Sequence, residues 1–264
     1  SSGSPVPAGY RLQPDPAERE LRVLYATDAE RRREPGGAAA EPARSDRPWV
    51  RASMIATLDG AATGPDGRSG TINGPADLRV FTVLRSLADA VLVGAGTVRA
   101  EGYTPLRTPE PLHAVRLAEG RPAHPTLVVV SGSGDVPAVV LHGEPAPWVC
   151  TLTTAPGLPA LRRVVSPERL IVHEGGVDLA DVLRRLGAAG LHDVLTEGGP
   201  ALLADLVGAG LVDELCLTTS PVLVGGPAGR VLAGPWLEPS AMAAPAHLLH
   251  ADGVLLGRWH LPRR

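Results

Sequence analysis

The chain of 264 residues contains no lysine, so all 25 of its basic residues are arginines. This absence excludes mechanisms that need a lysine, namely a Schiff base, a P-loop lysine or a lysine general base. Aromatic residues are also scarce at 3%, and Phe81 is the only phenylalanine. Glycine and proline, by contrast, supply 31 and 27 residues. We attribute this excess, with that of alanine and arginine, to compositional bias of the genome.

Long hydrophobic runs are absent as well. No apolar run approaches the roughly 20 residues of a membrane span. No signal-peptide pattern opens the chain, so we expect a cytoplasmic protein without a membrane contact. The formal net charge of −3 at pH 7 argues against a nucleic-acid partner.

Only two cysteines are present, Cys150 and Cys216, and each lies in an apolar, strand-like run. They can form one disulfide, but we favour two buried free thiols in a reducing compartment. Neither cysteine has a second cysteine or a histidine at the spacing of a zinc site, so we expect no bound metal.

The first 46 residues differ from the rest of the chain. Residues 1–15 are rich in serine, proline and glycine, and Pro16–Tyr25 is predicted to form a short helix. Residues 28–47 have the composition of a linker, and their arginine triplet fits a solvated charge run better than an anion site. We therefore divide the chain into a flexible N-terminal extension, residues 1–46, and one folded domain, residues 47–264.

From Trp49 onward, predicted strands alternate with predicted helices. Short apolar runs bounded by turn residues indicate strands at Trp49–Ala56, Ala90–Val93, Thr126–Val130, Val149–Leu152, Leu170–His173, His192–Thr196 and Leu215–Thr219. Periodicity and capping residues indicate helices at Pro75–Ala88, Asp178–Ala189 and Pro200–Ala209. In the first helix, the predicted buried face consists of Leu78, Phe81, Leu84 and Leu87. Asp252-Gly253 predicts a hairpin between His247–Ala251 and Val254–Leu261. This order indicates an α/β fold: a mostly parallel central sheet, flanked by helices, with an antiparallel C-terminal hairpin.

Two glycine-containing loops each follow a predicted strand. The first contains Gly94, Gly96, Thr97, Val98 and Arg99, and the second contains Glu197, Gly198, Gly199, Pro200, Ala201 and Leu202. Bare backbone and a helix N-terminus allow close contact with phosphate, so the two loops together can bind the pyrophosphate of a dinucleotide. The first loop alone is equally consistent with a strand-to-helix turn, because the third glycine of the G-x-G-x-x-G fingerprint falls at Arg99. A single Gly-Gly pair before a helix, as in the second loop, is usually only a connector.

The strand after the first loop lacks an acidic residue at its end. It is followed by Ser131-Gly132-Ser133 instead. Ser131 and Ser133 can donate hydrogen bonds to a 2′-phosphate, which favours NADP over NAD, although a plain polar turn is an equal alternative.

Asp59 directly follows the first predicted strand. An Asp-Gly pair is typical of a turn, but a carboxylate at a sheet edge can also bind a substrate hydroxyl or amine, or relay a proton. The polar loop that follows adds residues at the same end of the sheet. We name Asp59 as the candidate catalytic residue. The candidates for substrate binding are Asp59, Arg68, Ser69, Thr71, Asn73 and Glu197.

Six segments in order resemble the reductase domain of riboflavin biosynthesis, the pyrimidine reductase family, which has a dihydrofolate reductase-like fold. They span roughly Arg47–Arg264 and comprise Ala56–Gly60, Gly67–Gly70, Asn73–Pro75, Leu87–Arg99, Glu197–Pro200, and Ala209–Leu215 followed by Pro221–Gly226. The resemblance implies reduction of the ribosyl group of 5-amino-6-(5-phosphoribosylamino)uracil to ribityl, with the hydride supplied by NADPH.

The resemblance also implies roles for particular residues. The Gly94–Arg99 and Glu197–Leu202 loops correspond to the NADPH site, and Asp59 matches the acidic residue of the substrate site. An arginine is expected to bind the substrate phosphate, with Arg68 as the first candidate and Arg99 or Arg230 as alternatives. Family members are commonly dimeric, so a homodimer is expected, with Leu215–Thr219 and the terminal hairpin as possible contacts.

The chain departs from the family pattern in two places. The zinc deaminase domain found in many members is absent, so we expect no deaminase activity. The usual Ala-Asp-Asp-Pro after Thr-Val-Arg is replaced at residues 100–105 by Ala-Glu-Gly-Tyr-Thr-Pro, which resembles a stand-alone, actinobacterial-type subgroup. Because these residues are expected to lie near the substrate, the change bears on which substrate is bound more than on which cofactor is bound. Two alternatives stay open: reduction of a pterin such as dihydrofolate, and nucleotide binding without turnover.

Overall fold

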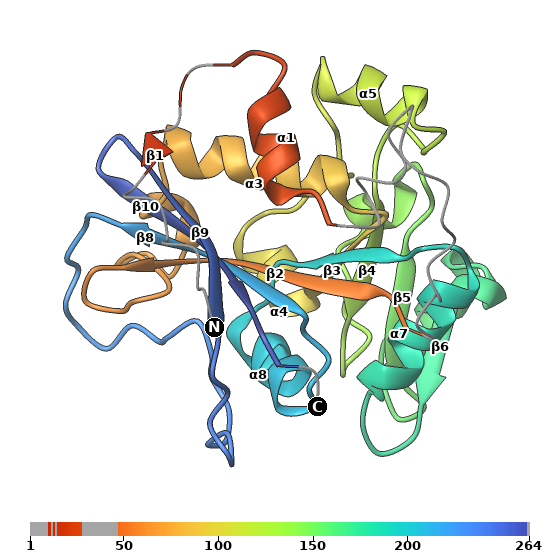
Figure 1. Ribbon diagram of the computed structural model, residues 1–264. Helices are drawn as coiled ribbons and strands as arrows, with labels where there is room; N and C mark the ends of the chain where they lie inside the picture. Colours follow the sequence, from red (N-terminus) through yellow and green to blue (C-terminus); the bar gives the residue numbers. More distant parts are fainter. Residues whose placement is uncertain (1–9, 12, 14, 28–46, 263–264) are drawn as a thin grey trace.

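The computed structural model describes residues 10, 11, 13, 15–27 and 47–262 (Figure 1). Within them, ten strands form one sheet in the order β1-β9-β10-β8-β2-β7-β3-β4-β5-β6. Seven neighbouring strands form a continuous parallel part, namely β2 (Trp49–Thr57), β3 (Ala90–Gly94), β4 (Thr126–Val130), β5 (Trp148–Leu152), β6 (Leu170–His173), β7 (Asp193–Thr196) and β8 (Glu214–Ser220). The hairpin of β9 (Ala244–Ala251) and β10 (Val254–His260) adds antiparallel strands, and β1 (Tyr10–Arg11) pairs with β9. The predicted α/β class is confirmed.

Helices cover both faces of the sheet (Figure 1). One face carries α1 (Arg19–Tyr25), α3 (Pro75–Leu87) and α5 (Leu112–Ala118), which pack into one apolar core. The other carries α7 (Leu179–Ala188) and α8 (Pro200–Gly208), which form a second core. The remaining α-helices are α4 (Ala95–Ala100) and α6 (Leu158–Val164). Because both faces are covered, β3 and β4 are almost entirely apolar, as their sequences predicted.

The long predicted helices are confirmed, but one predicted buried face is partly wrong. Pro75 begins α3, and Leu84 and Leu87 are buried, yet Leu78 is 48% exposed and Phe81 is half-buried. Both line a cavity described below. Asp178 caps α7 as predicted, because its side chain accepts a hydrogen bond from the backbone N–H of Asp181 at 3.0 Å. The helices α4, α5 and α6 were not predicted, since six or seven residues give little periodicity.

The short N-terminal helix packs on the main domain. Leu21 and Tyr25 of α1 are each 1% exposed and belong to the same core as α3. The C-terminal carbonyls of α1 accept hydrogen bonds from the sheet, at 2.6 Å from Arg51 to Tyr25 and at 2.7 Å from Arg258 to Leu24. The predicted linker and its arginine triplet lie outside the described residues.

The two cysteines are free and buried, and burial raises the pKa of each thiol to about 12. No cluster of potential metal ligands occurs among the described residues. None of the helices described there is long and apolar enough to span a bilayer.

The position of β8 corrects one expectation about assembly. Its backbone is hydrogen-bonded to β2 on one side and to β10 on the other. Leu215–Thr219 therefore offers no free edge for pairing with a second subunit. The homodimer itself stays a prediction.

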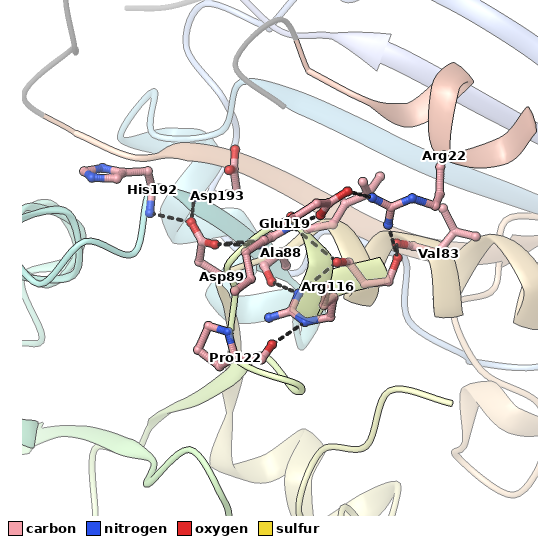
Figure 2. Close-up of polar contacts among 12 residues, drawn as sticks. Arg22, Val83, Ala88, Asp89, Arg116, Glu119, Pro122, His192 and Asp193 are labelled. Carbon is pink, nitrogen blue, oxygen red and sulfur yellow. Dashed lines mark hydrogen bonds and ion pairs between the residues drawn. The ribbon is translucent and has the colours of Figure 1, made fainter. Parts of the chain in front are cut away.

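Buried arginines cap the C-terminus of α3 (Figure 2). Arg116 of α5 donates to the carbonyls of Ser86 and Ala88 at 2.8 and 2.7 Å, and to that of Pro122 at 2.8 Å. Burial, with some repulsion from nearby Arg121, lowers the pKa of Arg116 to about 9. Cations are favourable near the carbonyl end of a helix, so these arginines fix the helix end from which β3 begins.

We expect Arg116→Met to destabilise the protein by about 3 kcal/mol or more, because it leaves the carbonyls of Ala88 and Pro122 with no charged donor. Urea unfolding followed by circular dichroism measures the change. Arg184→Met is the matched control, since Arg184 has a side chain 62% exposed and should change stability by less than about 1 kcal/mol. Equal effects of the two substitutions would contradict the capping role.

Candidate active site

A cavity of about 610 Å³ opens at the carboxyl ends of the central strands β2, β7 and β3. Its walls include Met54 of β2, Asp77 of α3, Gly96 of α4 and Pro200 of α8. Open α/β sheets bind ligands at this end of their strands. The cavity is therefore the candidate active site.

The two glycine loops meet beside this cavity. Because β7 pairs directly with β3, the loops that follow them are neighbours, and the N–H of Gly94 donates to the carbonyl of Gly198 at 2.8 Å. A Cβ on Gly199 would lie 2.6 Å from the Thr97 hydroxyl, so this approach requires glycine. A Cβ on Gly96 would meet nothing within 4 Å, which shows free space at the cavity wall.

Three other residues of the two glycine loops do not line the cavity. Val98 is 1% exposed and Leu202 9% exposed, and each packs into one of the two cores. Ala201 is exposed and does not line the cavity. The side chains of Val98 and Leu202 therefore anchor the two loops, and a ligand contact of either residue would be through its backbone.

Arg99, Ser131 and Ser133 converge on one turn outside the cavity. Arg99 donates to the Asp135 carbonyl at 2.7 Å and pairs with its carboxylate at 3.1 Å. The hydroxyls of Ser131 and Ser133 lie 3.4 and 3.3 Å from backbone atoms of Asp135. The structure thus groups the residues expected to bind a 2′-phosphate, and their role stays a prediction.

Asp59 lies on the surface and does not line the cavity. One carboxylate oxygen accepts from the Thr57 hydroxyl, and the other accepts from the N–H groups of Val224 and Gly225 at 3.2 and 2.7 Å. The bond from Thr57, followed by that from Gly225, lowers the pKa of Asp59. These contacts join two loops, and the catalytic role of Asp59 stays a prediction.

The polar loop before α3 divides into two groups. Ser69 and Asn73 line the cavity, and Ser69 donates from its N–H and its hydroxyl to Glu101 at 2.8 and 3.0 Å. Arg68 and Thr71 are exposed and do not line the cavity. Arg230, an alternative phosphate ligand, is likewise exposed and not among the lining residues.

Glu197 joins a buried polar cluster on the cavity wall. Arg85 of α3 donates to both carboxylate oxygens, at 2.6 and 2.7 Å, and the Tyr103 hydroxyl donates to one of them. The Arg85 guanidinium also lies over the Phe81 ring, 4.3 Å from its centre. Burial opposes the charge on Arg85, but the Glu197 carboxylate raises the pKa of Arg85 above its ordinary value. Burial, and then Glu197, raise the pKa of Tyr103.

Sequence reasoning missed four residues that line the cavity: Asp77, Arg85, Tyr103 and Arg107. Asp77 and Arg85 lie on a helix that was assigned only a packing role. Tyr103 and Arg107 lie in or next to the segment that departs from the family pattern, which was the available signal for them.

The fold and the cavity define a ligand-binding α/β domain, and comparison with known proteins places it in a family. Residues 48–244 match the family described as "RibD C-terminal domain". A 2,5-diamino-6-ribosylamino-4(3H)-pyrimidinone 5′-phosphate reductase of Archaeoglobus fulgidus is 30% identical over 68% of this chain and 83% of its own. A protein of the same name from Methanothermobacter thermautotrophicus is 33% identical over 70% and 83%. The chain therefore belongs to the RibD C-terminal domain family, and the expected resemblance is confirmed.

Two further comparisons describe the extent of the likeness. The riboflavin biosynthesis protein RibD of Mycobacterium tuberculosis is 31% identical over 71% of this chain, which spans 46% of that longer protein. A solved structure of a pyrimidine reductase-like protein from Corynebacterium diphtheriae has a TM-score of 0.76 and 24% identity, covering 92% of this chain and 99% of its own. This second likeness shows the shared fold.

Proposed function

We propose that this chain is an NADPH-dependent reductase that converts the ribosyl group of a (5-phosphoribosylamino)pyrimidine to ribityl. The observation that carries the proposal is the contact between the two glycine loops beside a 610 Å³ cavity. The names of the relatives that match over 83% of their length support the reaction class and a phosphorylated pyrimidine substrate.

The described residues fit a dinucleotide. The free space at Gly96 leaves room for a pyrophosphate near the N-terminus of α8. Arg99, which is 44% exposed, with Ser133 beside it, can bind a 2′-phosphate, which favours NADPH. When bound, the cofactor supplies the hydride that reduces the substrate.

Other polar residues of the cavity fit the substrate. The cluster of Glu197, Arg85 and Tyr103 offers polar groups for the sugar hydroxyls. Arg107 lines the cavity with an exposed guanidinium, 3.2 Å from His124, and we assign it to the substrate phosphate in place of Arg68. The residues of the cavity would then orient the C1′ carbon of the opened sugar toward the cofactor. The C=N bond at this carbon is reduced by addition of a hydride to carbon and a proton to nitrogen.

Gly96→Val tests the cofactor site. Its side chain enters free space, so folding should be preserved, but it fills the wall where the dinucleotide is placed. We expect at least a tenfold rise in the Kd for NADPH, about 1.4 kcal/mol, with little change in Tm. Fluorescence titration of NADPH and a thermal melt measure the two quantities.

Gly229→Val, in a loop that does not line the cavity and also has free space at its Cβ, is the matched control and should bind NADPH as the wild type does. NADPH oxidation is then followed with the uracil substrate, with the 2,5-diaminopyrimidinone and with dihydrofolate. Turnover of dihydrofolate alone would contradict the proposed substrate class, and turnover of none would contradict the reductase assignment.

A further inference from the structure

Asp77 is a carboxylate of the cavity that the function proposed above does not use. It lies in the first turn of α3, and the Thr218 hydroxyl of β8 donates to its Oδ1 at 2.6 Å. Thr218 is itself 5% exposed. One carboxylate oxygen is therefore fixed by a buried hydroxyl on the neighbouring strand.

The other oxygen of Asp77 has no hydrogen-bond donor among the described residues, although the side chain lines the cavity. The remaining cavity carboxylates are engaged: Glu101 accepts from Ser69, and Glu197 accepts from Arg85. No described arginine pairs with Asp77, and burial raises its pKa. The Asp77 side chain is partly buried and lines the cavity, so a ligand bound there can supply donors to the oxygen that no described residue contacts.

The two pyrimidines considered for this chain differ at C2 and in the hydrogen that the uracil carries on N1. The 2,5-diaminopyrimidinone named for the relatives carries an amino group at C2, whereas the uracil substrate carries an oxygen there. Away from the sugar-bearing nitrogen, the first ring presents two adjacent donors, N3–H and the 2-amino group. The uracil ring presents N3–H between two carbonyl acceptors.

We propose that Asp77, held by Thr218, selects a 2-aminopyrimidin-4-one ring over a uracil ring by accepting N3–H and the 2-amino group. This inference rests on the proposed function and names its substrate more closely. An ionised carboxylate has only acceptors, so it pairs with two adjacent donors and is repelled by the uracil C2 oxygen. Charge-assisted pairs of this kind are roughly twice as strong as neutral ones.

Asp77→Asn is the informative substitution because it keeps the shape and changes the hydrogen-bonding pattern. An amide presents one acceptor and one donor, which matches N3–H and the C2 oxygen of uracil. The wild type is expected to favour the 2-amino substrate at least tenfold in kcat/KM. In Asp77→Asn the ratio of the two kcat/KM values should fall by about 100-fold, since a site that hydrogen-bonds a substrate group discriminates strongly.

Binding of the free rings gives a second readout that does not need turnover. The probes are 2,5,6-triaminopyrimidin-4(3H)-one and 5,6-diaminouracil, which differ at C2 and in the hydrogen that the uracil carries on N1. Competitive inhibition or calorimetry gives their Kd values. Thr218→Val is the companion variant, which keeps the carboxylate but frees it to rotate, and it should weaken discrimination only in part. Asp77→Asn should not lower Tm, because it removes a buried charge that no described cation pairs with.

The outcomes separate this inference from the function on which it rests. A wild-type preference for uracil, or equal losses with both substrates in Asp77→Asn, would overturn the role of Asp77 while leaving the reductase assignment intact. NADPH oxidation with neither substrate, together with unchanged ring discrimination in the variant, would overturn both. A shift in ring preference without turnover would support Asp77 and refute the reaction.

Discussion

Replacing Glu197 by glutamine is expected to lower kcat/KM about 100-fold. The substitution removes the charge that holds the Arg85 guanidinium through two hydrogen bonds of 2.6 and 2.7 Å, and it weakens the bond from Tyr103. Both partners line the cavity, and a displacement of about 1 Å at such a wall can reduce the rate by this factor. Steady-state kinetics with the pyrimidine substrate measures the loss.

Tyr103→Phe is the matched control for this cluster. It deletes one hydroxyl donor and leaves the pairing of Arg85 with Glu197 in place, so we expect a loss of at most about tenfold, consistent with one hydrogen bond. Glu197→Gln with wild-type kinetics would show that the cluster only stabilises the fold. A larger loss in Tyr103→Phe than in Glu197→Gln would assign the chemistry to the tyrosine instead.

Glu214→Gln is expected to destabilise the protein by about 3–5 kcal/mol. Glu214 is 0% exposed and binds two buried arginines, Arg51 of β2 and Arg258 of β10, the second at 2.8 and 3.0 Å. Glu214→Gln leaves the positive charges of the two arginines buried without a negative partner. Removing one partner of a buried ion pair destabilises a protein by about this amount. The same arginines hold the end of α1, so that helix should lose its protection from hydrogen exchange as well.

The pH dependence of stability follows from the same carboxylate. Burial opposes its ionisation, but Arg51 and Arg258 lower the pKa of Glu214 below the ordinary glutamate value. A carboxyl group with a lowered pKa stabilises the folded state above its unfolded pKa of about 4.3, and this stability is lost as the pH falls through the folded value.

Urea unfolding between neutral and acidic pH tests both expectations. Asp135→Asn, at an ion pair whose carboxylate is 70% exposed, should change stability by less than about 1 kcal/mol. Glu214→Gln should also show a shallower acid dependence than the wild type. If Glu214→Gln lowers the free energy of unfolding by no more than Asp135→Asn does, the buried contacts of Glu214 with the two arginines contribute little to stability.

Much of the fold could be predicted because its main signals are local. Apolar runs such as Ala90–Val93 and Thr126–Val130, Pro75 at a helix start and Asp252-Gly253 at a hairpin each depend on neighbouring residues. The meeting of the two glycine loops also followed from the rule that parallel strands end at one edge. Short helices such as α5 were missed because they are stabilised by tertiary contacts, here the buried Arg116.

The candidate site was less predictable because it depends on long-range contacts. Arg85 and Glu197 are 112 residues apart, and Asp77 and Thr218 are 141 apart, so no local pattern links them. Phe81 and Leu78 have the spacing of core residues, yet they line the cavity because they share with Arg85 the face of α3 that is turned toward it. Asp59 lies in a turn, as its Asp-Gly pair indicated, and its catalytic role stays a prediction.

Transfer of deuterium tests the central claim most directly. The purified protein is incubated with the phosphoribosylaminopyrimidine substrates and NADPH that carries deuterium at both C4 positions of the nicotinamide, and the product is examined by mass spectrometry and NMR. The proposed function predicts one deuterium per product molecule, located at C1′ of a ribityl chain. A product without deuterium, or NADPH left unconsumed with both substrates, would contradict the account.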